Sequence, residues 1–229
     1  MSKIVYHGHS FIEINHNGNV IFIDPFIEGN PFCDIKLNDS VCNSCNYIIL
    51  THGHFDHLGS TLVLAKDKDL EVIAVDELSG YVYNQKGIKV HGMNIGGSFQ
   101  FPFGRVKFTI AHHTSSTPEG NYAGEPAGLI LNIGDKTIYH AGDTALFYDM
   151  KLIGEMNKID YAFLPIGDTY TMGVDDAVKA AEFLNANLII PIHYNTFDQI
   201  KADENDFKRK VESVGKKCVV MNAGDELNY

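Results

Sequence analysis

Residues 47–60 have the sequence YIILTHGHFDHLGS, and this stretch decides the fold expected for the chain. Its first four residues, 47–50, are apolar, which predicts a short buried strand. The segment that begins at Ser60 and continues with apolar residues to Ala65 predicts a helix. Residues 51–60 are therefore expected to form the loop at the carboxyl end of a core strand.

This loop carries four side chains of the metal-ligand type within six positions, namely His52, His54, Asp56 and His57. A single histidine near a strand end is usually a capping or core residue, but this density has no use in packing. His52 and His54 can reach one metal ion. Asp56 and His57 can reach a second ion beside it. Because imidazole and carboxylate together suit zinc, iron or manganese, the loop predicts a metal centre.

The order His-X-His-X-Asp-His after an apolar strand resembles the signature of the metallo-β-lactamase superfamily. His54 occupies the second ligand position, where the di-iron oxygen-reducing branch has Glu, so the site resembles the hydrolytic branch. The nearest resemblance is to a group of bacterial and archaeal metal-dependent hydrolases related to ascorbate-6-phosphate lactonase. It extends over nearly the whole chain and implies an α/β (α+β) fold, a four-layer αββα sandwich with two mixed sheets inside and helices outside.

Length and composition fit one domain over residues 1–229, because a chain of 229 residues with 45% hydrophobic content can bury a large core. The net charge of −11 and the lack of any Lys/Arg cluster argue against a nucleic-acid partner. An anionic substrate would have to be attracted by the metal ions locally. The sequence has neither a signal-peptide pattern nor an apolar run of about 18 residues, so we expect a cytoplasmic protein without a membrane partner. The sequence does not set the oligomeric state.

The motif Cys42-Asn-Ser-Cys45 has the spacing of a redox or zinc motif. Only Cys33 and Cys218 occur elsewhere, so a zinc site would need all four cysteines to converge without a second Cys-X-X-Cys. We expect reduced thiols in a loop that leads into the core strand. A redox role for Cys42 and Cys45 is the alternative.

The remaining apolar segments predict strands and helices on both sides of the ligand loop. Residues 3–24 predict two strands joined by a turn at 15–19, and residues 26–46 predict an irregular loop beside the metal mouth. Further strands are expected at 70–75, at 88–90, 98–103 and 106–111 as an antiparallel meander, and at 129–131, 136–139, 160–164, 188–190 and 218–221. Helices are expected at 76–86, where Asp76 is the cap, and at 145–157, 174–186 and 203–214.

The segment 111-AHHTSS-116 follows the meander and offers one more ligand to the first metal ion. Strand alternation puts His112 on the face of Val106 and His113 on the opposite face, which does not choose between them. The related hydrolases have Ala-X-His followed by small hydroxyl residues, so the resemblance selects His113. The next loop, residues 115–126, is either a lid over the site or a solvated connector.

The resemblance also assigns residues at three other strand ends. Asp24 matches the acidic residue that orients a metal-ligating histidine through a hydrogen bond. Asp143 matches the carboxylate that bridges the two metal ions. His140, beside it, is the competing ligand candidate, and we expect it to support the site from outside the ligand set. His193 matches the last ligand, which belongs to the second ion.

The ligand set implied by the resemblance is a dinuclear centre of two divalent ions, with zinc expected first and manganese or iron as alternatives. The first ion would be held by His52, His54 and His113, the second by Asp56, His57 and His193, and Asp143 would lie between them. Because this set is complete without His7 and His9, those two histidines are expected at the rim of the site or behind its ligands.

These residues predict a metal-dependent hydrolase that cleaves an ester, lactone or phosphodiester bond in a small metabolite. Two ions about 3.5–4 Å apart can hold a bridging hydroxide as the nucleophile, and Asp56 would orient it. Asp56 and Asp143 are therefore the expected catalytic carboxylates. The alternative is a non-catalytic metal-binding or sensing module in which residues 115–126 cover the mouth. A redox enzyme would need a flavin domain or Glu at position 54, and the sequence has neither.

Overall fold

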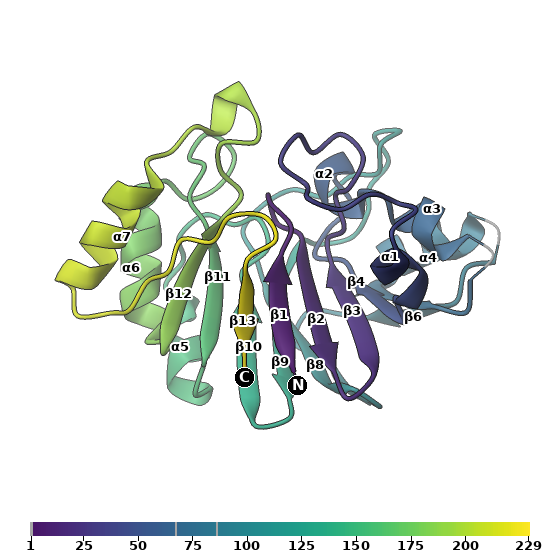
Figure 1. The fold of residues 1–229 in the computed structure, drawn as a ribbon, viewed down its shortest axis with the longest axis horizontal. Helices are drawn as coiled ribbons and strands as arrows, with labels where there is room; N and C mark the ends of the chain where they lie inside the picture. Colours follow the sequence, from purple (N-terminus) through teal and green to yellow (C-terminus); the bar gives the residue numbers. More distant parts are fainter. Residues whose placement is uncertain (1, 67, 86) are drawn as a thin grey trace.

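The structure is a computed structural model that describes residues 2–66, 68–85 and 87–229, and it contains two β-sheets (Figure 1). The first sheet has the order β13-β1-β2-β3-β4-β5-β6 and the second has the order β12-β11-β10-β9-β8-β7. The strands of the first sheet are β1 (Lys3–Tyr6), β2 (Ile12–His16), β3 (Asn19–Ile23), β4 (Tyr47–Ile49), β5 (Glu71–Val75), β6 (Val90–Met93) and β13 (Glu226–Asn228). Those of the second are β7 (Ser98–Phe101), β8 (Gly104–Ile110), β9 (Ala127–Ile133), β10 (Lys136–His140), β11 (Tyr161–Pro165) and β12 (Leu188–Ile192).

Helices flank the sheets on two sides (Figure 1). The helices beside the first sheet are α1 (Ser40–Ser44), α2 (Phe55–Leu58), α3 (Thr61–Ala65) and α4 (Asp76–Asn84). Those beside the second are α5 (Asp149–Met156), α6 (Val174–Leu184) and α7 (Glu204–Ser213), with the 3-10 helix η1 (Asp198–Ile200) before α7. Within the described part of the chain, no helix has the length and apolarity to cross a bilayer. The mixed sheets and flanking helices confirm the predicted sandwich.

Alternate residues of the second sheet pack into two different cores, as strand geometry requires. Leu129 and Leu131 of β9 join the large core that also holds the first sheet, whereas Ile130 faces the opposite way. Ile130 packs with the buried stripe of α6, which includes Ala177 and Leu184. Burial on both faces explains why these strands are continuous apolar runs in the sequence.

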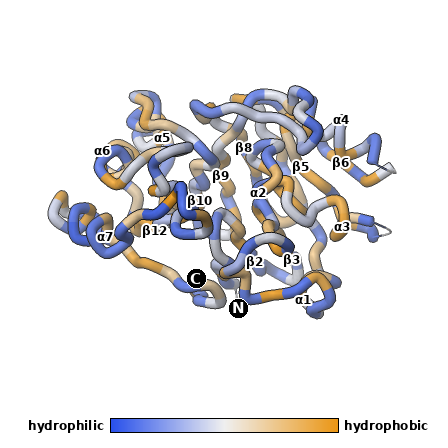
Figure 2. Tube along the Cα trace, turned by 90° about the horizontal axis from the view of Figure 1, so that it is seen from above, coloured by the Kyte–Doolittle hydropathy of each residue, from blue (hydrophilic) through white to orange (hydrophobic). Residues whose placement is uncertain are grey.

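The loops that carry the predicted ligands gather at one edge of the molecule. In the first sheet β3, β4 and β5 run parallel, and in the second β10, β11 and β12 run parallel. Parallel strands end at the same edge of a sheet, and in Figure 1 these ends of both sheets lie at the top, beside α2 and the loop with η1. Figure 2 views the molecule from that edge.

Residues 3–24 form three strands, so the prediction of two was wrong. The chain turns between β1 and β2 at Gly8 and His9, whose backbones have positive φ angles of 88° and 58°. The amide of Phe11 donates to the carbonyl of Gly8 at 3.1 Å and closes this turn. A left-handed histidine is uncommon, and for that reason the sequence pattern gave no sign of the turn.

Several predicted boundaries were also wrong. The predicted loops 26–46 and 51–60 contain the short helices α1 and α2, and α4 begins after Val75 without a side-chain cap from Asp76. The segment at 88–93 is not part of the meander, because β6 pairs parallel with β5 after the α4 crossover. Residues 218–221 make only an isolated bridge from Cys218 to Ile189, and the last strand is β13, which pairs with β1.

Candidate metal centre

The structure brings the seven predicted metal ligands together where the two sheets meet at the loop edge. Their ligand atoms fall into three overlapping groups, and within each group the atoms lie within 4.8 Å of one another. The groups are His52, His54 and His113; His52, His57 and Asp143; and His9, Asp56, His57 and His193. The two ends of the cluster correspond to the two predicted ion sites.

The first group is a set of three imidazoles that face one another. The Nε2 atom of His52 and the Nε2 atom of His113 lie 3.0 and 3.3 Å from the Nδ1 atom of His54. Burial lowers the pKa of His52 well below its ordinary value and also lowers the pKa values of His54 and His113. Neutral imidazoles with converging ring nitrogens suit a divalent cation better than they suit packing.

Asp143 lies between the two ends of the cluster. Its Oδ2 atom is 3.1 Å from Nε2 of His193 and 3.6 Å from Nε2 of His113, and its Oδ1 atom is 3.3 Å from Nε2 of His57. Gly142 permits this position, because a Cβ atom there would lie 2.5 Å from the carbonyl oxygen of Ala127. A carboxylate placed between histidines of both groups has the geometry expected of a bridging ligand.

His140 holds the backbone beside Asp143 and does not contact the Asp143 carboxylate by a hydrogen bond. Its Nδ1 atom accepts from the amide of Gly142 at 3.1 Å, and its Nε2 atom lies 3.2 Å from the carbonyl oxygen of Ser10, to which it donates. The side chain is fully buried. These contacts agree with the expected place of His140 outside the ligand set.

Four buried ligand atoms lack a hydrogen-bond partner among the described residues. They are His57 Nε2, Asp143 Oδ1, and both ring nitrogens of His193. An unsatisfied buried polar atom costs roughly 1–3 kcal/mol, so four in one place require a partner. Metal ions at this position would supply a partner for His57 Nε2, Asp143 Oδ1 and His193 Nε2, which faces Asp56 and Asp143, and the donor set of imidazole and carboxylate fits zinc, manganese or iron.

Asp24 fixes the orientation of His57. The Nδ1 atom of His57 donates to Oδ2 of Asp24 at 2.7 Å, while Thr51 donates to Asp24 from its amide at 2.8 Å and from its hydroxyl at 2.6 Å. With Nδ1 bonded to Asp24, the neutral ring of His57 presents the Nε2 lone pair to the centre, where a bound cation would take the place of a second proton. Burial lowers the pKa of His57, but the carboxylates of Asp143, Asp24 and Asp56 outweigh burial and raise the pKa well above its ordinary value.

His9 lies behind the predicted ligand Asp56, which is one of the two places expected for it from the sequence. Its side chain is buried, with Nε2 3.0 Å from Oδ2 of Asp56 and Nδ1 2.9 Å from Oγ1 of Thr196. Burial lowers the pKa of His9 to about 4, so the neutral ring donates to the Asp56 carboxylate and accepts from Thr196. His9 lies in the turn between β1 and β2, and nothing in the neighbouring sequence identifies its contact with Asp56.

Three residues of the centre have left-handed backbones: His9 has a φ angle of 58°, Asp24 one of 48° and His193 one of 53°. The amide of His193 donates to the carbonyl oxygen of His9 at 2.8 Å, which joins the first and last of these loops.

The side chain of His7 does not contact the metal-ligand groups. Its ring is hydrogen-bonded to Asp34 at 2.7 Å and to Glu13 at 2.9 Å. These two carboxylates outweigh burial and raise the pKa of His7.

The two candidate histidines at 112 and 113 occupy different environments. His113 faces His52 and His54, whereas the ring of His112 packs against Phe147 with a centroid separation of 5.0 Å. The amide of His112 donates to the hydroxyl of Thr144 at 3.0 Å. This geometry agrees with the choice of His113.

The loop at 115–126 packs against the ligand motif. The hydroxyl of Ser115 accepts from the amide of Gly53 at 3.2 Å and donates to the carbonyl oxygen of Ala123 at 3.2 Å. A Cβ atom on Gly53 would lie 2.6 Å from Cβ of Ala123, so the two segments are in close contact. A cavity of about 580 Å³ opens beside the centre, and its lining includes His54, Asp56, His113, Asp143 and His193 but no residue of 115–126.

The four cysteines are free thiols, and none of them is part of the metal-ligand groups. Burial raises the pKa of Cys42 to about 11 and that of Cys45 to about 12. Both values favour the protonated thiol at neutral pH, whereas a redox-active cysteine needs a depressed pKa. The geometry therefore agrees with ordinary reduced thiols.

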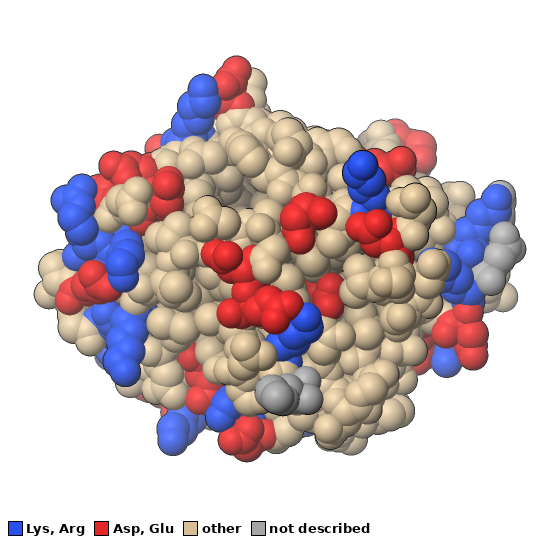
Figure 3. All heavy atoms as spheres, in the orientation of Figure 1, with Lys and Arg blue, Asp and Glu red and all other residues tan. Residues whose placement is uncertain are grey.

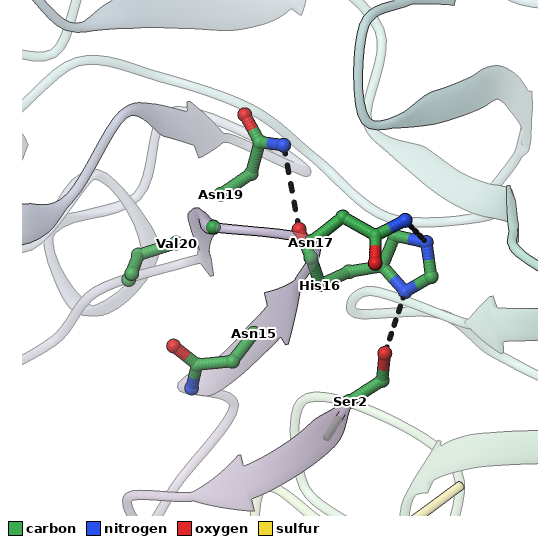
Figure 4. Close-up of a pocket in the computed structure, with 7 residues that line it drawn as sticks. Ser2, Asn15, His16, Asn17, Asn19 and Val20 are labelled. Atoms are coloured by element: carbon green, nitrogen blue, oxygen red, sulfur yellow. Dashed lines mark hydrogen bonds between the residues drawn. The ribbon is translucent and has the colours of Figure 1, made fainter.

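Two other surface features lie away from the centre. A pocket at the β2–β3 hairpin, at the opposite end of the first sheet, is lined mainly by polar residues, and its His16 ring is bonded by Ser2 and Asn17 (Figure 4). Figure 3 shows acidic side chains near the middle of the face that carries β13 and β1, in keeping with the net charge of −11. Neither feature brings metal-ligating groups together in the way that the loop edge does.

Comparisons with known proteins agree with this geometry. The family model "Beta-lactamase superfamily domain" matches residues 19–194. The chain is 52% identical to a "UPF0173 metal-dependent hydrolase" of Anoxybacillus flavithermus, with 98% of this chain and 99% of that protein covered, and 50% identical over the same shares to one of Bacillus cereus. Igni18, a metallo hydrolase of Ignicoccus hospitalis, superposes with a TM-score of 0.90 at 36% identity, covering 100% of this chain and 99% of that one. The chain belongs to the metallo-β-lactamase superfamily, as a metal-dependent hydrolase.

Proposed function

We propose that this hydrolase uses a dinuclear centre to cleave an ester, lactone or phosphodiester bond in a small molecule. The observation that supports a dinuclear centre best is the position of Asp143, between histidines of the two ligand groups. The first ion would be held by His52, His54 and His113, the second by Asp56, His57 and His193, and both by Asp143. Zinc is the first choice, with manganese or iron as alternatives. Residues 1–229 would form one domain around this site.

The residues of the centre have separate roles in this proposal. A pair of divalent ions, when bound, supplies Lewis acidity for a carbonyl or phosphoryl oxygen and makes water a better nucleophile. Asp143 balances the positive charge. Asp24 keeps His57 in the tautomer that presents Nε2, and His9 donates to one oxygen of Asp56. The Asp56 carboxylate lines the cavity, where it can accept a proton from the attacking water and orient that water.

A non-catalytic metal-binding or sensing module is the second candidate. It would keep the ligands but close the mouth with residues 115–126. In the structure these residues pack beside Gly53, and the cavity opens directly onto Asp56 and Asp143. An open cavity at the ligands favours turnover over sensing.

Metal content tests the dinuclear centre. The protein, as purified or after reconstitution with zinc, should contain about two divalent ions per chain by elemental analysis. A ceiling of one ion in metal-replete buffer would contradict the proposal.

The Asp143→Asn variant tests catalysis. It should bind the second ion more weakly and lose turnover of generic ester, lactone, thioester and phosphodiester substrates even in excess metal, because a neutral amide is a poor bridge. His112→Ala is the matched control and should retain both metal and turnover. Full activity of metal-replete Asp143→Asn would refute the bridging role.

A further inference from the structure

The cavity beside the centre has an aromatic part of its lining, made by Phe55, Tyr170 and Phe197 and called here the aromatic wall. Phe55 and Tyr170 are 59% and 57% exposed, and Phe197 is partly buried. The apolar side chain of Ile200, which is fully buried, adds to this lining. Large apolar side chains that stay exposed in a concave site indicate contact with an apolar ligand.

This wall is a built feature of the fold. The rings of Phe55 and Phe197 lie 6.1 Å apart, and both rest on the buried ring of Phe26 at 5.9 and 6.2 Å. The hydroxyl of Thr169 donates to the carbonyl oxygen of Gln199 at 2.8 Å and so joins the loop of Tyr170 to the loop of Phe197. The rings of Phe55 and Phe197 are therefore packed on Phe26 before any ligand arrives, and the segment that carries Tyr170 is tied to that of Phe197.

The acidic residues that line the cavity are two of the proposed metal ligands. Among the described residues that line it, Asp56 and Asp143 carry the negative charge, and neither Lys nor Arg is present. Lys201 follows the wall in sequence but is 70% exposed and pairs with Asp198 at 2.7 Å. A phosphate or carboxylate on the part of a substrate away from the metal ions would lose hydrating water in the cavity, and no cationic side chain there would compensate for that loss.

We infer that the cavity binds the uncharged apolar part of the substrate, an alkyl or aryl group next to the scissile ester or lactone carbonyl, and rejects substrates with an anionic group at that position. The inference rests on the proposed hydrolytic function and narrows its substrate class. It differs from a substrate that is anionic away from the metal ions, because no Lys or Arg is among the residues that line the cavity.

A homologous ester series tests the inference. We expect kcat/KM of the metal-loaded enzyme for 4-nitrophenyl acetate, butanoate, hexanoate and octanoate to rise by up to about 4-fold for each added methylene that is buried. The mono-4-nitrophenyl ester of octanedioic acid has the same chain with a terminal carboxylate, and it should be at least about 10-fold poorer than the octanoate. Phe55→Ala and Tyr170→Ala should flatten the rise, whereas Tyr148→Ala, an exposed aromatic outside the cavity, should leave it unchanged.

A binding measurement separates the failure of this inference from the failure of the proposed function. The chain has no Trp, so Phe55→Trp introduces the single indole directly into the wall, at an exposed position that can accept it. Titration with octanamide should change the indole fluorescence, and the monoamide of octanedioic acid should bind at least about 10-fold more weakly.

The outcomes of the two measurements are distinct. Binding of octanamide without turnover of any ester would refute the proposed hydrolysis of esters and support the apolar subsite. Turnover that is independent of chain length, or that is equal for the two eight-carbon esters, would overturn the apolar subsite and leave the hydrolase in place. Equal binding of the two amides would overturn it as well.

Discussion

Replacement of Asp24 by Asn tests how the centre holds His57 in its ligating form. The Asp24 carboxylate accepts three hydrogen bonds, one from His57 Nδ1 at 2.7 Å and two from Thr51 at 2.6 and 2.8 Å. Asn keeps one of the two acceptor oxygens and replaces the other with an NH2 group, which is itself a donor and would face the donors of Thr51 or His57. Both Asp24 and His57 are fully buried, so water cannot resolve this conflict.

The conflict is relieved if the His57 proton moves from Nδ1 to Nε2. That tautomer removes the lone pair that faces Asp143, because Nε2 then carries hydrogen. Loss of a hydrogen-bonded partner of this kind lowers metal affinity by about 10–100-fold. The corresponding change in binding free energy is about 1.4–2.8 kcal/mol. We expect both ions to remain bound at high metal concentration.

Competition with a chromophoric chelator measures the affinities, and 15N NMR of the imidazoles reports the tautomer. Thr51→Ser is the matched control, since it keeps the hydroxyl that donates to Asp24 and lies 3.0 Å from Nδ1 of His52, and it keeps the contact between Asp24 and His57. It should lower affinity by less than about 10-fold. Wild-type affinity at both sites in Asp24→Asn, or a His57 that stays protonated on Nδ1 in that variant, would refute the reasoning.

Three further predictions concern other parts of the structure. His113→Ala should lose one of the two ions in elemental analysis while His112→Ala keeps both, and the opposite ranking would move the ligand by one residue. Gly142→Ala should lower the free energy of unfolding in urea by at least about 1 kcal/mol, because φ is +61° and the new Cβ would meet the Ala127 oxygen at 2.5 Å; an unchanged midpoint would contradict this. His7 has a raised pKa in the folded protein, so its stabilising effect is complete below pH 6.5 and is lost as pH rises through the folded value. The stability difference between wild type and His7→Gln should therefore shrink between pH 6 and 9, and a difference that grows with pH would have the wrong sign.

The part of the centre that could be predicted from the sequence is the part encoded locally. His52, His54, Asp56 and His57 follow one apolar strand, and their spacing alone indicates metal ligands. The αββα sandwich was implied by the family resemblance, and the apolar patterns of the sequence indicated most of its strands and its longer helices. The resemblance added His113, which strand alternation could not select over His112.

The parts that could not be predicted depend on contacts between distant segments. His9 meets Asp56 across 47 residues of sequence, and nothing in its neighbours shows that the chain turns back at Gly8. The pairing of β6 with β5 and of β13 with β1 is likewise decided by which edges remain open after the central strands have paired. Local patterns carry no information about such choices.

The left-handed backbones of His9, Asp24 and His193 have an evolutionary consequence. This conformation costs a residue with a side chain about 1–2 kcal/mol, a cost that glycine avoids. Glycine at any of the three positions would relax the backbone and would also delete a side chain that the centre uses. At position 24, glycine or asparagine would also leave the buried donors of Thr51 and His57 without their full set of acceptors, so the backbone strain is the smaller of the two costs there. Selection for turnover should therefore keep a functional side chain at all three positions despite the strain.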